Sequence, residues 1–387
     1  MYERTACLAL AATLALPAPA APAAERPGAE QPGIRLSGYY KNILSRSETV
    51  FPAPEHYTAD LNRLRLVLKG KPVEDISFEL QYDNEVLLGS YLDTAQFRLQ
   101  KDRPSGQYWK ADANYAEGQN YYGLHRLYRG FVTFSPGNTD ARFGRQRIAW
   151  GTGRFWSPTD VLNPIRPTQL ERDERPGTDA LLVERKFGPL SRLSAVYAPQ
   201  HDRGDSSAAI RWHGNHAGID YSVVGGGFGR DRMAGMDLAS QIGSAGVRGE
   251  LTHTRPEAGP SYERAVAGLD YAFSNTLVLS AEIYHNGAGA SDLRDYDFAS
   301  LFTGRIQNVG RRYLGLFAGY EITPLLKWNN YFVANLADHS RYFSPTLTYS
   351  LRTNLDLTMG VQLFAGNNGS EYGQFNDVHY MQLQWFF

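Results

Sequence analysis

Most of the chain alternates between apolar and polar residues, and short turn segments separate the alternating runs. The clearest run extends from Ile76 to Asp83, where Ile, Phe, Leu and Tyr occupy every second position. The run from Leu355 to Phe364 has the same period of two. Successive side chains of a β-strand lie on opposite faces, so this period predicts strands with one apolar and one wet face. No stretch has the period of an amphipathic helix, and we therefore expect an all-β fold.

Short turns and long polar segments alternate between these strands. Ser135-Pro136-Gly137-Asn138 and Thr353-Asn354 are typical of the short turns. The longer polar segments cover residues 45–60, 84–122, 149–179, 287–310 and 366–376. Outer-membrane β-barrels show this asymmetry, with short periplasmic turns and long external loops. Pairing the strands from Ile34 onward predicts a transmembrane antiparallel β-barrel of about 16–18 strands, an even number if both ends face the periplasm.

The N-terminus has the pattern of an export signal. An apolar stretch from Ala6 to Leu16 precedes Ala21-Pro22-Ala23, which matches an A-x-A cleavage site. We therefore predict a signal peptide over residues 1–23, a short periplasmic segment over 24–33 and a barrel over 34–387. The single cysteine, Cys7, lies in the predicted signal peptide, so the mature chain would contain no disulfide and no cysteine-bound metal.

The last strand carries a second localisation signal. Counting back by twos places Phe387, Trp385, Leu383 and Met381 on one face. A final strand with an apolar face and a terminal Phe resembles the signal that outer-membrane barrels present to the barrel-assembly machinery, here through Trp385 and Phe387. Outer-membrane lipid and lipopolysaccharide are then the expected surroundings, in the cell outer membrane of a Gram-negative bacterium. The alternative is the closing strand of a soluble periplasmic β protein.

Composition excludes several other classes of protein. The 39 basic and 40 acidic residues give a net charge of −1, so no basic excess indicates nucleic acid. The mean hydropathy of −0.41 excludes a bundle of apolar membrane helices. The nine histidines form no H-E-x-x-H motif, and no G-x-S-x-G occurs. We expect no metal, no cofactor and no enzymatic activity.

One central block differs from its surroundings. The segment from Arg142 to Pro164 runs from a strand with Gly-Arg-Gln into Trp-Gly and a loop with Pro and Asn, and the loop continues to Ala180. This block resembles the loop region of porin-like outer-membrane barrels in the neighbourhood of the alginate-export family. The resemblance implies the fold and an outer-membrane location, and it implies no particular substrate.

The same loop is our candidate for a pore constriction. We expect it to fold into the lumen and to oppose its carboxylates to arginines on the wall, because rings of charge select the solutes of a pore. Arginine suits this role because it stays charged and binds carboxylate or phosphate through two donors. The candidate residues are Arg142, Arg145, Arg147, Arg154, Arg166, Glu171, Arg172, Asp173, Glu174, Arg175 and Asp179.

Two points about this loop stay open. Its Arg–Glu pairs could belong to a surface loop and only hold its shape, since surface ion pairs are common and individually weak. Arg145 also has the opposite strand parity to Arg142, unless a bulge near Gly144 changes the side that it faces.

The expected function is a porin-like channel, because barrels of about 16–18 strands are wide enough to leave an aqueous lumen. The abundance of arginine favours anionic solutes, and the solutes would be small and hydrophilic; export of a polyanionic chain fits the same pattern. The alternatives are a structural barrel that sheathes a periplasmic partner protein and an outer-membrane enzyme that modifies lipid. Whether the barrel forms a homo-oligomer is left open by the sequence.

Overall fold

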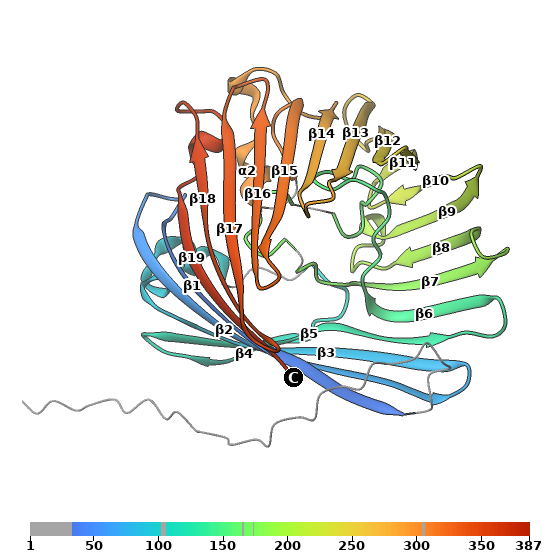
Figure 1. The fold of residues 1–387 in the computed structure, drawn as a ribbon, viewed down its shortest axis with the longest axis horizontal. Helices are drawn as coiled ribbons and strands as arrows, with labels where there is room; N and C mark the ends of the chain where they lie inside the picture. Colours follow the sequence, from blue (N-terminus) through green and yellow to red (C-terminus); the bar gives the residue numbers. More distant parts are fainter. Residues whose placement is uncertain (1–32, 102–105, 165, 173, 304–305) are drawn as a thin grey trace, which may run out of the picture.

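The computed structural model describes residues 33–387 except 102–105, 165, 173 and 304–305. The predicted signal peptide, Cys7 and residues 24–32 therefore lie outside the described residues. Within them, one antiparallel sheet contains 19 strands (Figure 1). The strands are β1 (Ile34–Glu48), β2 (His56–Val73), β3 (Ile76–Leu88), β4 (Asp112–Glu117), β5 (Tyr121–Phe134), β6 (Thr139–Gln146), β7 (Thr178–Lys186), β8 (Arg192–Ala198), β9 (Ser207–His216), β10 (Ile219–Phe228), β11 (Asp231–Ile242), β12 (Ala245–Arg255), β13 (Tyr262–Ala272), β14 (Val278–Asn286), β15 (Arg312–Thr323), β16 (Leu326–Asn335), β17 (Arg341–Arg352), β18 (Leu355–Ala365) and β19 (Val378–Phe386).

The sheet closes on itself, because β1 pairs with β2 on one side and with β19 on the other. The short strand β4 stands outside the regular order. β3 pairs directly with β5, and β4 pairs with the half of β5 that β6 does not reach. The wall is therefore a closed barrel of 18 antiparallel strands, and the predicted fold class is confirmed.

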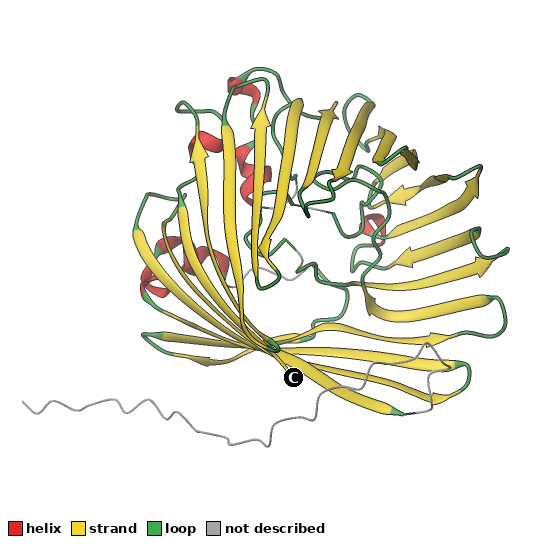
Figure 2. Cartoon of the chain, viewed as in Figure 1, coloured by secondary structure: helices red, strands yellow, loops and turns green. Residues whose placement is uncertain are grey.

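Short and long connections lie at opposite ends of the barrel. Glu74-Asp75 joins β2 to β3 in a tight turn, whereas four long connections occur at the other end. We name these L2 (89–120), L3 (147–177), L7 (287–311) and L9 (366–377). L2 and L7 contain the two α-helices, α1 (Ala95–Gln100) and α2 (Phe298–Thr303), which the sequence pattern did not predict because each has only six residues (Figure 2). Neither helix is long and apolar enough to cross a membrane.

The two faces of the wall differ in polarity as the alternation predicts. Leu64, Val132 and Ile283 are 38, 50 and 60% exposed on the outer face. Arg63 and Arg65 flank Leu64 on β2 and are buried on the inner face. A closed sheet leaves no backbone group unpaired, and an apolar outer face suits lipid, so the barrel is the form in which strands cross the outer membrane.

The last residues complete the closure. Phe387 and Gly38 exchange both backbone hydrogen bonds, at 2.9 and 3.0 Å. The Phe387 ring lies over Gly38, where a Cβ atom would come within 2.8 Å of it. Met381 and Trp385 are 40 and 41% exposed on the outer face, as the alternation predicts. Their role as an assembly signal remains a prediction.

Candidate functional site

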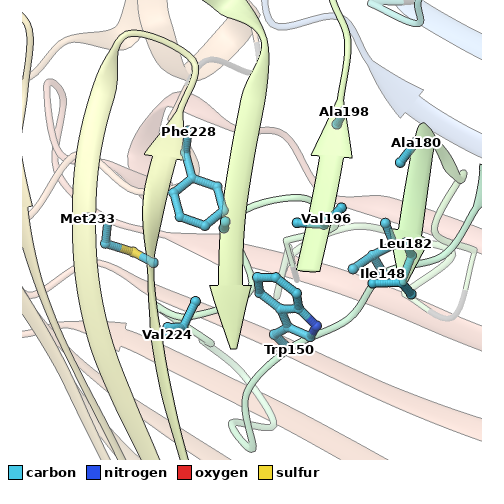
Figure 3. Packing of buried hydrophobic residues seen from close by; sticks show 10 residues of the cluster. Ile148, Trp150, Ala180, Leu182, Val196, Ala198, Val224, Phe228 and Met233 are labelled. Carbon is cyan, nitrogen blue, oxygen red and sulfur yellow. The ribbon is translucent and has the colours of Figure 1, made fainter. Parts of the chain in front are cut away.

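L3 folds into the barrel and begins in an apolar sector of the inner wall. Ile148 and Trp150 are buried against side chains of β7, β8, β10 and β11 (Figure 3). These wall residues include Leu182, Val196 and Met233. Lumen positions are polar where water fills the interior, and this sector departs from that pattern because L3 covers it.

Two buried carboxylates of the wall hold the next part of L3. Glu250 on β12 accepts hydrogen bonds from the backbone N–H groups of Thr152, Gly153 and Thr159 at 2.6–3.1 Å, and also from two hydroxyls. Glu282 on β14 accepts from the N–H groups of the next three residues, 154–156. Hydrogen bonds to a charged acceptor are stronger than neutral ones, so these two glutamates fix the backbone of residues 152–159.

Two glycines allow the backbone to adopt this tight turn. Gly151 has a φ of +96°, a conformation that residues with a side chain rarely adopt. At Gly153, a Cβ atom would collide with the carbonyl oxygen of Trp156. The stretch Trp150-Gly151-Thr152-Gly153, inside the block that differs from its surroundings in sequence, therefore makes the sharp turn into the segment that Glu250 and Glu282 bind.

An aromatic cluster anchors L3 next. The Trp156 ring stacks on Tyr284 of β14 at 5.2 Å and lies 5.7 Å from Tyr313 of β15. Its indole N–H donates to Asn308 of L7 at 3.0 Å. Phe155 contacts Tyr331 of β16 edge-on. Trp156 is only 2% exposed, so this anchor contributes substantial apolar burial.

The following residues of L3 contact β16, β17 and β18. The Arg172 guanidinium lies 3.7 Å from the centre of the Tyr331 ring and donates to the Tyr342 hydroxyl at 2.6 Å. Gln362 of β18 donates to the carbonyl of Thr168 at 3.2 Å. Together, these contacts extend the attachment of L3 to β18.

L3 then reaches β1 and β2 through two glutamates. Glu171 accepts two hydrogen bonds from Arg63, at 2.7 and 2.9 Å, and one from Lys41 at 3.0 Å. Glu174 accepts from Arg65 at 2.7 Å and from Lys41 at 3.1 Å. Burial alone would raise the pKa of both carboxyls, but Arg63 and Lys41 beside Glu171, and Lys41 and Arg65 beside Glu174, lower each pKa below its ordinary value.

The basic residues of this contact are themselves held by the wall. Arg63 donates to Glu85 at 2.5 Å, and Arg65 donates to both oxygens of Asp83 at 2.6 and 2.7 Å. The Arg65 guanidinium also stacks on the Tyr128 ring at 3.5 Å. A buried charge is tolerated when it is paired and hydrogen-bonded, and each of these charges is.

The end of L3 returns to β5 and closes the circuit. Arg129 of β5 donates to the carbonyl of Arg175 at 2.9 Å, and the N–H of Gly177 donates to the carbonyl of Tyr128 at 3.4 Å. L3 thus contacts strands around most of the inner circumference. We call residues 147–177, without the undescribed 165 and 173, the collar.

The predicted opposition of loop carboxylates and wall arginines exists, but the wall partners differ from the predicted ones. Arg142 lies 5.0 Å from the Phe131 ring and is 3.4 Å from the Thr133 hydroxyl, not beside the collar glutamates. Arg147 is exposed beyond the end of β6. The partners are Lys41, Arg63 and Arg65 instead, because the collar reaches β1 and β2 before it turns back.

Arg145 and Asp179 form a separate buried pair. They face each other in the register of β6 and β7, with an Nε–Oδ1 distance of 2.8 Å. The other Arg145 donors bind the carbonyls of Leu127 and Trp109. The Arg145 guanidinium therefore binds Asp179 and two backbone carbonyls, and it does not face the collar glutamates.

The remaining candidates lie at separate places in the collar. Arg154 is 4.8 Å from the Phe317 ring, with its Nε 3.6 Å from Asp270. Arg166 is exposed. Arg175 is 3.2 Å from Asp160, and Asp173 lies outside the described residues.

Sequence reasoning missed the wall residues that hold the collar, namely Lys41, Arg63, Arg65, Glu250 and Glu282. The available signal was a charged residue on the polar face of a strand, as in Arg63-Leu64-Arg65. That signal places a side chain in the lumen. It does not show which lumen residues meet a distant loop, because this depends on the height and angle of each strand around the barrel.

Four arginines at this level have a buried Nε atom with no hydrogen-bond partner among the described residues. They are Arg126 and Arg129 of β5 and Arg154 and Arg175 of the collar. The Nε atoms of Arg126 and Arg154 lie 3.6 Å from carboxylate oxygens of Asp83 and Asp270. Burial raises the pKa of Asp160 to about 8, although the Arg175 guanidinium beside it lowers this pKa.

Comparison with known proteins shows similarity at the level of the fold. No protein-family model matches the chain, and the search of curated proteins finds no match. Crystal structures of similar fold include Pseudomonas aeruginosa OccK5 (OpdH), with a TM-score of 0.59 and 11% identity over 91% of this chain and 97% of that one. Pseudomonas aeruginosa OpdK with vanillate has a TM-score of 0.58 and 11% identity over 92% and 98%. Acinetobacter baumannii OccAB1 has a TM-score of 0.55 and 11% identity over 92% and 96%.

These identities establish the fold and no closer relationship. The chain has the architecture of a Gram-negative outer-membrane porin-like barrel, as its sequence predicted. The narrower resemblance to the alginate-export neighbourhood, inferred from residues 142–180, is not supported, since the similar structures belong to another group of porin-like barrels.

Proposed function

We propose that this protein is an outer-membrane channel through which small hydrophilic solutes diffuse, with a preference for anions. The observation that carries the proposal is the collar, a long loop that folds inside the barrel and contacts strands around most of the inner wall. No chemical step is part of the proposal.

The preference for anions rests on the arginines of the collar and of β5. The glutamates that face the collar are paired with arginine, lysine or backbone N–H groups, and the side chains of Glu171 and Glu174 are only 17 and 16% exposed. The side chains of Arg126 and Arg154 are each 34% exposed. Charged groups that line a pore set its selectivity, so these guanidinium groups favour an anion over a cation. Vanillate, which accompanies one structure of similar fold, is a carboxylate and belongs to the proposed class of solute.

Swelling of proteoliposomes tests the proposal. We expect faster entry of a small carboxylate such as benzoate than of a neutral solute of similar size. Replacing the two β5 arginines together, Arg126→Gln with Arg129→Gln, removes two positive charges beside the collar and lowers this ratio. The matched control is Arg232→Gln on β11, an exposed arginine of the outer face. Equal entry of both solutes into wild-type vesicles, or a ratio unchanged by the double replacement, contradicts the preference for anions.

The predicted partners other than the solute, which are the assembly machinery, lipopolysaccharide and a second copy of the chain, remain expectations from the sequence. A barrel that instead sheathes a periplasmic protein would purify with that protein in stoichiometric amount and would admit neither solute.

A further inference from the structure

The outer wall carries an apolar groove that the channel function does not use. It has a volume of about 740 Å³ and runs across β16, β17, β18, β19 and β1, which lie side by side in Figure 1. One row of side chains, paired in register from strand to strand, borders it: Trp328, Leu347, Met359, Met381 and Leu44. Each is 40–50% exposed on the outer face.

A break in the sheet accounts for the groove. Phe343 of β17 pairs with Leu363 of β18, and the next paired residue of β17 is Thr346. Pro345 therefore has no partner on β18 within the described sheet. Proline has no backbone N–H and removes a hydrogen bond from the ladder. Its compact ring and the neighbouring Val361 occupy less space than the Trp, Leu and Met side chains of the adjacent row, which leaves the wall hollow here.

Two basic side chains stand at the outer end of this groove. Arg46 of β1 and His379 of β19 face each other in register, and both are exposed on the outer face. Neither forms an ion pair with any described residue, in contrast to Arg63, Arg65 and Arg211 on the inner face. Arg46 and the imidazole N–H of His379 can therefore both donate to one anion between them.

The position of this pair suits the headgroup level of a membrane. His379 lies eight residues before Phe387, which marks the other end of β19. A strand tilted by about 45° with a rise of about 3.3 Å per residue covers ~19 Å of membrane thickness over that length, close to the ~25 Å of the apolar band. The pair therefore lies near the interface at the end of the long loops, and the groove lies within the apolar layer.

We propose that this groove binds an anionic lipid of the outer leaflet, with an acyl chain along the Trp328–Met381 row and the phosphate between Arg46 and His379. Arginine binds phosphate through two donors. The apolar row takes the chain out of contact with mobile lipid and fixes it against the wall. This inference is independent of the proposed channel, because every residue involved faces away from the lumen.

Native mass spectrometry of the detergent-purified barrel tests the proposal with dimyristoyl phosphatidylglycerol as the anionic probe and dimyristoyl phosphatidylcholine as the zwitterionic one. We expect wild type to retain the anionic lipid preferentially. Replacing both basic residues, Arg46→Gln with His379→Gln, lowers its retention by about tenfold, since charge-assisted hydrogen bonds are lost. The matched control is Arg312→Gln on β15, an exposed arginine outside the groove, which leaves retention unchanged.

A second variant tests the acyl-chain part of the site. Val361→Phe fills the groove without adding or removing charge, and we expect weaker retention of both lipids. Both variants face lipid and keep the lumen intact, so heat-modifiable migration on a gel verifies that they fold. The proposal is overturned if wild type retains the two lipids equally. It is also overturned if the Arg46/His379 variant retains the anionic lipid as well as wild type does. An equal loss of the anionic lipid in the Arg312→Gln control would show an effect of general surface charge and overturns the proposal. Unchanged retention by Val361→Phe overturns it as well.

Discussion

At the scale of single residues, the collar depends on buried charges that each have more than one partner. Arg65 is the clearest case, because it joins Asp83 of β3 to Glu174 of the collar, and its side chain is only 6% exposed. Asp83 is fully buried. The next guanidinium groups lie 3.6 and 4.0 Å from Asp83, on Arg126 and Arg63, so Asp83 depends mainly on Arg65. Glu174 keeps Lys41 as a second partner.

Replacing Arg65 tests this dependence. Arg65→Met leaves Asp83 buried without its main partner, and we expect a loss of about 3–5 kcal/mol in the free energy of unfolding, the usual cost of breaking a buried pair. Urea unfolding in detergent measures it. The control Arg192→Met removes an arginine that is 47% exposed and 3.9 Å from Glu184, and it changes stability by less than about 1 kcal/mol. Adding Asp83→Leu restores part of the loss, and a loss as small as the control's contradicts the argument.

The collar glutamates also predict a pH dependence. Their pKa values are lowered in the folded protein, so the ion pairs are fully present above the ordinary carboxyl pKa of about 4.3 and weaken only as pH falls through the lower folded value. We therefore expect Glu171 and Glu174 to cause no change in channel conductance between pH 5 and pH 8. The variant Glu171→Gln with Glu174→Gln should show a larger conductance at every pH in this range, because the collar detaches from β1 and β2. A wild-type conductance that rises toward the variant's value between pH 8 and pH 5 refutes this assignment.

At the scale of elements, L3 keeps its path because strands on several sides of the barrel each hold one part of it. Glu250 of β12 is the most connected anchor, since backbone N–H groups and two hydroxyls converge on its carboxylate. Glutamine in its place presents one oxygen and an amide group that itself donates, so it cannot accept all of these hydrogen bonds.

The expected result of Glu250→Gln is a loosened turn at residues 152–159. Amide hydrogen exchange of this segment should become faster by about tenfold or more, because charge-assisted hydrogen bonds are lost. Glu263→Gln is the matched control, since Glu263 is 65% exposed and only 3.6 Å from His253 at the surface. If both variants exchange at the wild-type rate, Glu250 does not hold the collar.

Particular elements show how far the sequence determines this structure. The alternation in Ile76–Asp83 predicts a strand and the side of the wall that each residue faces. Together with the terminal Phe387 it predicts an outer-membrane barrel, because these features are local and periodic. The folding of L3 into the lumen follows from its length and charge. Its partners do not, since Arg63 and Glu171 are 108 residues apart in the chain, and their contact depends on where β2 stands in the closed wall.

The apolar inner sector was unpredictable for the same reason. Leu182 and Val196 are apolar residues that face the inside of the barrel, where polar residues are expected. Their position is favourable because Ile148 and Trp150 of L3 cover them.

At the scale of the whole molecule, the barrel is completed by its last residues. Phe387 pairs with Gly38 through both backbone hydrogen bonds. Phe387→Ala removes the ring that covers Gly38 and the terminal aromatic of the predicted assembly signal, and we expect severalfold less folded barrel in the outer membrane. Heat-modifiable migration of membrane fractions measures it. Tyr349→Ala removes another exposed aromatic of the outer face and should leave the amount unchanged. Equal amounts of both variants would mean that Phe387 has no special role in assembly.

The central claim is that the collar narrows a lumen that remains open. Single-channel conductance of the purified, folded barrel in a planar bilayer under a salt gradient tests this most directly. The account predicts discrete conductance steps and a reversal potential on the anion side, because the arginines at the collar are more exposed than its glutamates. A folded barrel that shows no conductance steps would contradict the claim, since the collar would then close the lumen.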